Sequence, residues 1–196
     1  TTDLALDSGV NPTSTREAVL RWARGVDVLD DDGDGDTTDV RFQMGDPIHS
    51  QPVIVNYSTT DSAVLVATNH GFLHSFDPDT GEENFAIIPR DLLVNLHDIY
   101  LDNSSFNHIY GLDGDLVLRD TGSQKILYLG MRRGGQNYYA IDVTNKTAPS
   151  VLFEIKSSNA GFEKLGQTWS RPTLTKVKLG ASERDVLIFG GGYDDT

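Results

Sequence analysis

The chain has 196 residues and a formal net charge of -13, because 16 Lys and Arg stand against 29 Asp and Glu. A field of this sign repels polyanions, which argues against nucleic acid and anionic membrane as partners. The chain contains no cysteine, and this excludes a thiol nucleophile, a disulfide framework and a thiolate metal site. Its 38% hydrophobic and 23% charged residues are typical of a globular domain with its own core.

Neither a membrane-spanning segment nor a targeting segment is expected. No apolar run approaches the roughly 20 residues that cross a bilayer, and the opening TTDLALDSGV lacks the basic and then apolar pattern of an export signal. We expect any export signal to lie on a longer precursor.

The first part of the chain, residues 1–26, is predicted to contain one short helix. The sequence STRE at 14–17 fits a capping box at a helix start. Apolar residues between 19 and 23 give this helix one apolar side, and Gly25 is a natural end for it. We interpret this element as a packing helix at a domain boundary.

The next stretch, residues 27–44, is predicted to be a calcium loop. It contains DDDGDGDTTD at 30–39, in which Asp recurs at every second position from Asp30 to Asp36 and Gly35 takes the sixth position. This is the opening of a D-x-D-x-D-G loop, whose alternation aims successive carboxylates at one centre. Ca2+, a hard ion that prefers oxygen ligands, is the expected cofactor. The predicted metal ligands are Asp30, Asp32, Asp34, Asp36 and Asp39, and no catalytic residue is predicted.

The loop departs from the calcium pattern at its twelfth position, where Arg41 stands in place of a bidentate Glu. Either Asp39 supplies the last ligand of a shorter loop, or Asp27 folds back toward it. Both arrangements suit a weak extracellular site with a Kd of roughly 10⁻⁴–10⁻³ M. The alternative is a solvated acidic linker without a metal, because blocks of like charge are often disordered.

The remainder, residues 45–196, reads as short strands between turn signals, with an irregular insertion at 91–112 that has one helical turn at Leu92 to Leu96. No long helical period interrupts these strands, which disfavours a parallel sheet with crossover helices. The predicted strands are 52–57, 63–68, 72–76, 84–88, 125–131, 137–142, 151–155, 173–178 and 185–190.

An internal repeat organises these strands. Equivalent strands begin near 64, 126 and 186, and each is followed by a glycine-containing turn. Units of about 60 residues made of short antiparallel strands are how propeller blades look in sequence, although a sandwich stays possible. The predicted fold class is therefore all-β, a partial β-propeller with quinoprotein-like blades and a short N-terminal helix, continuing beyond this fragment.

A set of ordered motifs resembles one family, the C-terminal β-propeller of the PilC/PilY type IV pilus tip adhesins and biogenesis factors. The motifs are GDPIHSQPVIV (45–55), VLVATNHGFLHSFDPDTGEE (64–83), YGLDGD (110–115), MRRGGQNYYAIDVT (131–144), LGQTWSRPTL (165–174) and FGGGYDD (189–195). The resemblance spans about residues 20–196. Each motif alone is weak, whereas their order is specific.

The resemblance implies an exported protein at the pilus tip, the outer-membrane surface or the extracellular space. It implies minor pilins of the tip complex as partners, together with a host-cell receptor or glycan, and roles in pilus assembly, control of retraction, twitching motility and adhesion. The family's propeller also carries a calcium loop, usually further along the chain than residues 30–39, so its ligands are not transferred by position.

Two other classes remain as alternatives. FLHSFDPDTGEE at 72–83 also resembles repeats of propellers that hold pyrroloquinoline quinone, which implies a dehydrogenase. Those enzymes commonly show a vicinal disulfide and a tryptophan-rich pattern, whereas this chain has no Cys and two Trp. A calcium-dependent glycan-binding lectin would share the scaffold. A binding and assembly protein that is not an enzyme is the preferred interpretation.

Three smaller features carry open alternatives. Arg132 and Arg133, which precede two glycines, either grip a pilin carboxylate or mark a turn between strands. Asp113 and Asp115 in GLDGD could ligate a cation, but a turn is favoured. Trp169 is expected to fill the wedge between two blades.

Overall fold

The computed structural model describes residue 4, residues 12–102 and residues 108–193. Asp194 and Asp195, which end the FGGGYDD motif, lie outside the described residues. The chain divides into two compact units, one made of residues 1–45 and 88–109 and the other of residues 46–87 and 110–196.

The first unit begins with helix α1, Pro12–Ala23. Proline suits a first helical turn, because its φ is already near the helical value and its missing N–H would have no partner there. Ser14 therefore lies inside the helix and is not its N-cap, so the predicted capping box at 14–17 is wrong. The C-terminal end is close to the predicted one, since Gly25 follows with a positive φ of 85°.

The insertion contributes two short helices to this first unit, η2 at Arg90–Asn95 and α2 at Leu96–Tyr100. The predicted helical turn at 92–96 is thus confirmed and extends further than expected. Helix α2 contacts α1, with the Trp22 and Tyr100 rings edge to face at 6.1 Å between centroids. The fully or nearly fully buried apolar side chains of the unit include Val19, Trp22, Leu92 and Leu96.

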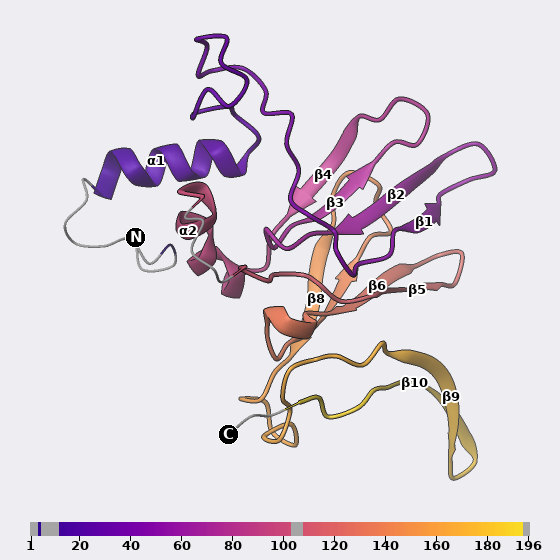
Figure 1. Cartoon of the computed structure of the whole chain (residues 1–196). Coiled ribbons are helices and arrows are strands. Elements are labelled where there is room, and N and C mark those ends of the chain that lie inside the picture. Colours follow the sequence, from indigo (N-terminus) through magenta and orange to yellow (C-terminus); the bar gives the residue numbers. More distant parts are fainter. Residues whose placement is uncertain (1–3, 5–11, 103–107, 194–196) are drawn as a thin grey trace. The chain divides into compact units, whose positions relative to one another are not determined.

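The second unit consists of antiparallel sheets (Figure 1). One sheet has four strands in the order of the chain, namely β1 (Val53–Asn56), β2 (Ser62–Ala67), β3 (Leu73–Phe76) and β4 (Glu83–Ile87). The other four-stranded sheet follows the same order with β5 (Leu116–Asp120), β6 (Lys125–Gly130), β7 (Tyr138–Asp142) and β8 (Ser150–Ile155). A two-stranded sheet contains β9 (Thr173–Leu179) and β10 (Ser182–Ile188), and a short helix η3 (Arg132–Gly134) lies between β6 and β7.

The predicted repeat corresponds to the second strand of each sheet. Strands β2, β6 and β10 begin at Ser62, Lys125 and Ser182, close to the predicted starts near 64, 126 and 186. The all-β class and the antiparallel pairing are confirmed. Strand β5 is absent from the predicted strands, because its sequence LVLRD is short and follows a glycine-rich turn, and it becomes a strand through its pairing with β6.

The two central strands of the β5–β8 sheet, β6 and β7, are buried on both faces, whereas the edge strand β8 is largely exposed. Alternate residues of a strand point to opposite faces, and on one face Ile126 and Tyr128 pack with Leu174 and Leu187 of the β9–β10 hairpin. On the other face Leu127 and Leu129 are completely buried. Every residue of β6 is therefore buried, so the core of the unit lies along the middle of this sheet.

Segments that precede the first strand of a sheet connect neighbouring sheets. In residues 110–115, before β5, the N–H of Leu112 donates to the carbonyl of Thr68 at the β2–β3 turn, 3.1 Å away. The segment before β9 is also joined to the preceding turn, but with donor and acceptor exchanged, because the N–H of Arg132 at the β6–β7 turn donates to the carbonyl of Thr168 at 3.3 Å. The first strands follow the same succession, with β1 against β5 and β5 against β9.

Within the described residues, no helix has the length and apolar character needed to cross a bilayer.

Candidate functional site

The acidic loop at 27–39 is closed at its base by backbone contacts. Val26 and Val40 form an antiparallel bridge, and the N–H of Asp27 donates to the carbonyl of Asp39 at 3.0 Å. The N–H of Arg41 donates to the carbonyl of Gly25 at 2.7 Å. The loop therefore starts just after α1, and its two ends, residues 25–27 and 39–41, are held together by these antiparallel backbone contacts.

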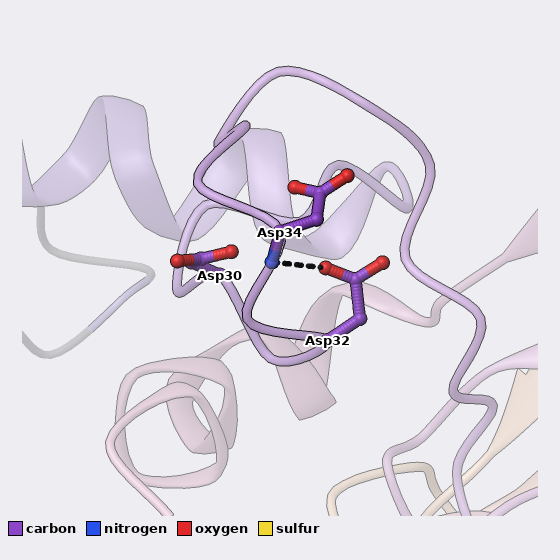
Figure 2. Close-up of side chains that lie close together, drawn as sticks. All are labelled: Asp30, Asp32 and Asp34. Atoms are coloured by element: carbon purple, nitrogen blue, oxygen red, sulfur yellow. Dashed lines mark hydrogen bonds between the residues drawn. The ribbon is translucent and has the colours of Figure 1, made fainter.

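Three predicted ligands come together in this loop. Asp30, Asp32 and Asp34 each offer a carboxylate oxygen, and these oxygens lie within 4.8 Å of one another. Figure 2 shows the three side chains around one turn of the loop. Oxygens bound to one Ca2+ at about 2.3–2.6 Å can lie up to about 5 Å apart, so the spacing fits a shared calcium ion.

Backbone N–H groups hold the carboxylates in place. The N–H of Asp34 donates to Asp32 Oδ1 at 3.2 Å, as drawn in Figure 2, and the N–H of Gly35 donates to Asp30 Oδ1 at 3.0 Å. Gly35 has a φ of 88°, a left-handed conformation that glycine adopts without strain. This matches the sharp turn that a calcium loop needs at its sixth position.

Asp36 lies in the same loop, but its carboxylate is not part of the group of three. Its Oδ1 accepts hydrogen bonds from the N–H and the hydroxyl of Thr38, at 2.8 and 2.6 Å. These bonds lower the pKa of Asp36 below its ordinary value. In a calcium loop the seventh position supplies its backbone carbonyl, so this side chain is free to close the turn.

Asp39 also lies outside the group of three, yet it responds to that group. Desolvation by its surroundings raises the pKa of Asp39, and the negative charges of Asp34, Asp32 and Asp36 raise it further. Its Oδ1 is inaccessible and has no hydrogen-bond partner among the described residues. An inaccessible carboxylate oxygen facing like charges is stabilised by a cation more readily than by water.

The other two residues considered for the loop have structural roles. Asp27 is 2% exposed, and both of its carboxylate oxygens accept the N–H of Asp31 at 3.0 Å. Arg41, at the twelfth position, places its guanidinium over the Trp22 ring at 4.0 Å. Burial lowers the pKa of Arg41, and the charges of Asp31 and Asp27 oppose this shift. Arg41 therefore anchors the loop to α1 and is no ligand.

A second charged cluster lies in the other unit. Asp113 has a completely buried side chain, and His49 Nδ1 lies 2.8 and 3.0 Å from its two oxygens. Arg132 Nε is 4.0 Å from the same carboxylate. The sequence favours a turn at Asp113 and does not link it to His49, since residues that are 64 positions apart share no local pattern. Gly114 follows Asp113 directly and Gly111 stands two residues before it, and this glycine-rich sequence is the one local sign that the carboxylate lies against backbone.

Trp169 does not fill a wedge between sheets. Its side chain is exposed, at 36% relative accessibility, and its ring lies under the guanidinium groups of Arg132 and Arg133, at 5.1 and 5.6 Å. The expected burial is therefore wrong, because the indole is partly exposed beneath two arginine side chains.

Fold and site together define an all-β protein of antiparallel sheets that carries a carboxylate cluster in an acidic loop. No protein-family profile matches the chain. A protein of Xylella fastidiosa named type IV pilus biogenesis factor PilY1 homolog is 30% identical over 182 residues, which cover 78% of this chain and 14% of that protein. Type IV pilus biogenesis factor PilY1 of Pseudomonas aeruginosa strain UCBPP-PA14 is 27% identical over an alignment 213 residues long, which covers 93% of this chain and 18% of that protein.

The chain belongs to the PilC/PilY family. It spans less than a fifth of the length of these relatives, 14% and 18% in the two cases. Among solved structures, the C-terminal domain of Pseudomonas aeruginosa PilY1 is similar with a TM-score of 0.48 and 27% identity, covering 69% of this chain and 25% of that chain.

Proposed function

We propose that this chain is a calcium-binding module of a type IV pilus biogenesis factor, a binding and assembly unit and not an enzyme. The observation that carries the calcium part is the convergence of Asp30, Asp32 and Asp34 within 4.8 Å. Membership of the PilC/PilY family carries the pilus part, since the matched relatives are named as pilus biogenesis factors. Those names favour assembly over the dehydrogenase and lectin alternatives.

The sheets of the second unit are proposed to be consecutive blades of a β-propeller. Two observations support this arrangement. Both four-stranded sheets are meanders in chain order, as propeller blades are. In addition, first strands contact one another in succession, β1 with β5 and β5 with β9, as strands around a common axis do.

Asp30, Asp32 and Asp34 would hold the calcium ion, with Asp39 as a further carboxylate and backbone carbonyls completing the oxygen set. The cation would reduce the repulsion among these carboxylates and make the loop more rigid between its paired ends. Because a calcium ion is bound only by the arranged loop, binding stabilises that arrangement by mass action.

In the whole protein, we expect this module to act after export, at the pilus tip or the cell surface, together with minor pilins. Adhesion to a host receptor or glycan, support of twitching motility and control of retraction belong to the same proposal. The relatives' names support the pilus context and leave the individual contacts to experiment.

Isothermal titration calorimetry with Ca2+ tests the metal site. We expect the chain to bind with a Kd of roughly 10⁻⁴–10⁻³ M, and the double substitution Asp32→Asn, Asp34→Asn to abolish the heat. The double substitution Asp79→Asn, Glu82→Gln removes two charges from the exposed β3–β4 turn and is the matched control. Absence of heat from the unaltered chain would end the calcium proposal.

Genetic complementation tests the pilus role. In a strain that lacks the native gene, the full-length gene should restore surface pili, and a gene with Asp30, Asp32 and Asp34 changed to Asn should restore fewer at low calcium. Normal piliation without any form of the gene would contradict a role in assembly.

A further inference from the structure

Basic and aromatic side chains gather at the β6–β7 turn of the second unit. The Arg132 guanidinium lies over the Trp169 ring at 5.1 Å, and that of Arg133 lies 5.6 Å from the same ring and 5.3 Å from the ring of Tyr110. Arg133 Nη1 also donates to the Tyr110 hydroxyl at 3.0 Å. These four residues form the arginine–indole cluster, which is positively charged although the chain carries a net charge of -13.

The backbone fixes the positions of these side chains. A Cβ on Gly134 would overlap the carbonyl of Gly111, so the turn lies directly against the segment that carries Tyr110. On the other side, the N–H of Met131 donates to the Thr168 hydroxyl at 2.8 Å, next to Trp169. Three segments that are distant in sequence are thus held together without help from the arginine side chains.

Arg132 adopts a conformation that a side chain rarely takes. Its φ is 50°, in the left-handed region, where residues other than glycine are uncommon and concentrate at functional sites. Its Nε is inaccessible and has no hydrogen bond among the described residues, although the buried carboxylate of Asp113 lies 4.0 Å away.

The buried carboxylate of Asp113 is the acidic group next to Arg132. This carboxylate already contacts His49 Nδ1 at 2.8 Å and lies 4.0 Å from Arg132 Nε, so one negative charge lies beside a cluster that contains two guanidinium groups. The cluster therefore keeps an excess of positive charge. Arg133 is exposed and uses one of its five N–H donors on Tyr110, so donors remain for a ligand at the surface.

We propose that the arginine–indole cluster binds a carboxylate presented by an acidic segment of a partner protein. The planar fork of an Arg side chain matches a carboxylate in two parallel hydrogen bonds. The indole face restricts both guanidinium groups before binding, which reduces the entropy that binding would otherwise lose. On an acidic surface, a local basic patch attracts one acidic segment and sets its register, while the surrounding charge repels extended polyanions.

This inference deepens the proposed function, because it names the chemistry of a partner contact, and it rests on that function only for the partner being a protein. It does not require a metal in the acidic loop. Calorimetry with Ca2+ and peptide binding therefore fail separately, and each failure identifies the proposal that is wrong.

The test uses a tetraglutamate peptide, acetylated and amidated at its ends, with the tetraglutamine peptide as the matched probe. Binding is followed by calorimetry and by tryptophan fluorescence, since Trp169 is exposed and Trp22 is 4% exposed. We expect the glutamate peptide to bind and the glutamine peptide not to bind. The same result is expected in chelator and in calcium.

Variants assign the binding to the cluster. Arg133→Gln changes an exposed side chain and should weaken binding about tenfold, the loss of about one good hydrogen-bonded charge contact. Arg133→Lys should recover part of the affinity, because the charge returns without the fork. Arg184→Gln, an exposed arginine on β10, should bind as the unaltered chain does.

Three results would overturn the proposal. The first is equal affinity for the two peptides, or none for either, in the unaltered chain. The second is a loss in Arg184→Gln as large as that in Arg133→Gln, which would mean that net charge alone attracts the peptide. The third is unchanged affinity in Arg133→Gln combined with Trp169→Leu.

Discussion

The acidic loop and the arginine–indole cluster are both groups of like charge, but they are built in opposite ways. The loop draws its carboxylates from a few consecutive residues, arranged by their own backbone N–H groups. The cluster draws its four side chains from three separate segments, at 110, 132–133 and 169, and backbone contacts between segments hold them together. The loop is thus a product of local geometry, whereas the cluster is a product of the sheet packing.

This difference predicts different responses to perturbation. A change in the backbone contacts between segments should affect the cluster and spare the loop. A change in metal concentration should affect the loop and spare the cluster. The following experiments examine that division, beginning with the largest expected effect.

Gly134→Ala should destabilise the chain by about 3 kcal/mol, the upper range for an overpacked site. The added Cβ would overlap the Gly111 carbonyl, a backbone atom that cannot rotate away. Urea unfolding measures the loss, and binding of the glutamate peptide should fall with it. Gly191→Ala is the matched control, since no atom lies within 4 Å of its added Cβ. Equal unfolding midpoints for both variants would contradict the close approach.

Calcium at 10 mM should stabilise the loop by about 1.4–2.7 kcal/mol, if the Kd lies at roughly 10⁻³–10⁻⁴ M. The measurement is urea unfolding in calcium and in chelator. In Asp32→Asn combined with Asp34→Asn the difference should disappear. A difference of the same size in this variant would place the stabilising ion elsewhere.

The pKa values of two loop carboxylates, Asp39 and Asp36, are shifted in opposite directions, so the two groups should change the pH dependence of stability in opposite ways. The raised pKa of Asp39, caused first by desolvation and then by Asp34, Asp32 and Asp36, means that the folded chain holds this proton more tightly than the unfolded chain. Its contribution to stability is present at low pH and is lost as pH rises through the folded-state pKa. The lowered pKa of Asp36 has the reverse effect, with stability present above 3.8 and lost as pH falls through its folded-state pKa.

NMR of the carboxyl carbons checks both directions. Calcium should lower the pKa of Asp39, because a cation favours its charged form. Asp142 is the control, because hydrogen bonds from Thr144 lower its pKa within the sheets and not within the loop. An Asp39 carboxyl that titrates identically with and without calcium would remove it from the metal site.

The surface ion pair between β5 and β10 should have the smallest effect. Arg119 Nη2 lies 2.6 Å from Asp185 Oδ2, and their side chains are 27% and 46% exposed. Exposed pairs contribute about 0.2–1 kcal/mol, so a double-mutant cycle with Arg119→Gln and Asp185→Asn should give a coupling of about 0.5 kcal/mol. A coupling above about 2 kcal/mol would mean that this pair contributes substantially to holding the β9–β10 hairpin against β5.

Much of the fold could be predicted, because most strands carry their own signals. Strands β2, β6 and β10 each contain an apolar run, at 63–67, 126–129 and 186–188, and each is followed by a glycine-containing turn, and both features are local. Strand β5 carries no such signal and depends on β6 for its hydrogen bonds. The start of α1 was misplaced, because Pro12 and Ser14 both suit a helix start and the sequence alone does not rank them.

The convergence of Asp30, Asp32 and Asp34 could also be predicted, since the spacing of residues along one loop decides which carboxylates come together. The separate roles of Asp36 and Asp39 could not, because a hydrogen bond to Thr38 and the accessibility of one oxygen depend on how the loop folds.

The sequence by itself determined the antiparallel strands and the acidic loop, because alternation, turns and closely spaced aspartates act over a few residues. Only the tertiary structure decided that His49 would hold a buried Asp113, and that Trp169 would lie beneath Arg132 and Arg133. Such partners come from different sheets or from the turns between them, and the packing of glycine-rich backbone against backbone is what brings them within contact distance.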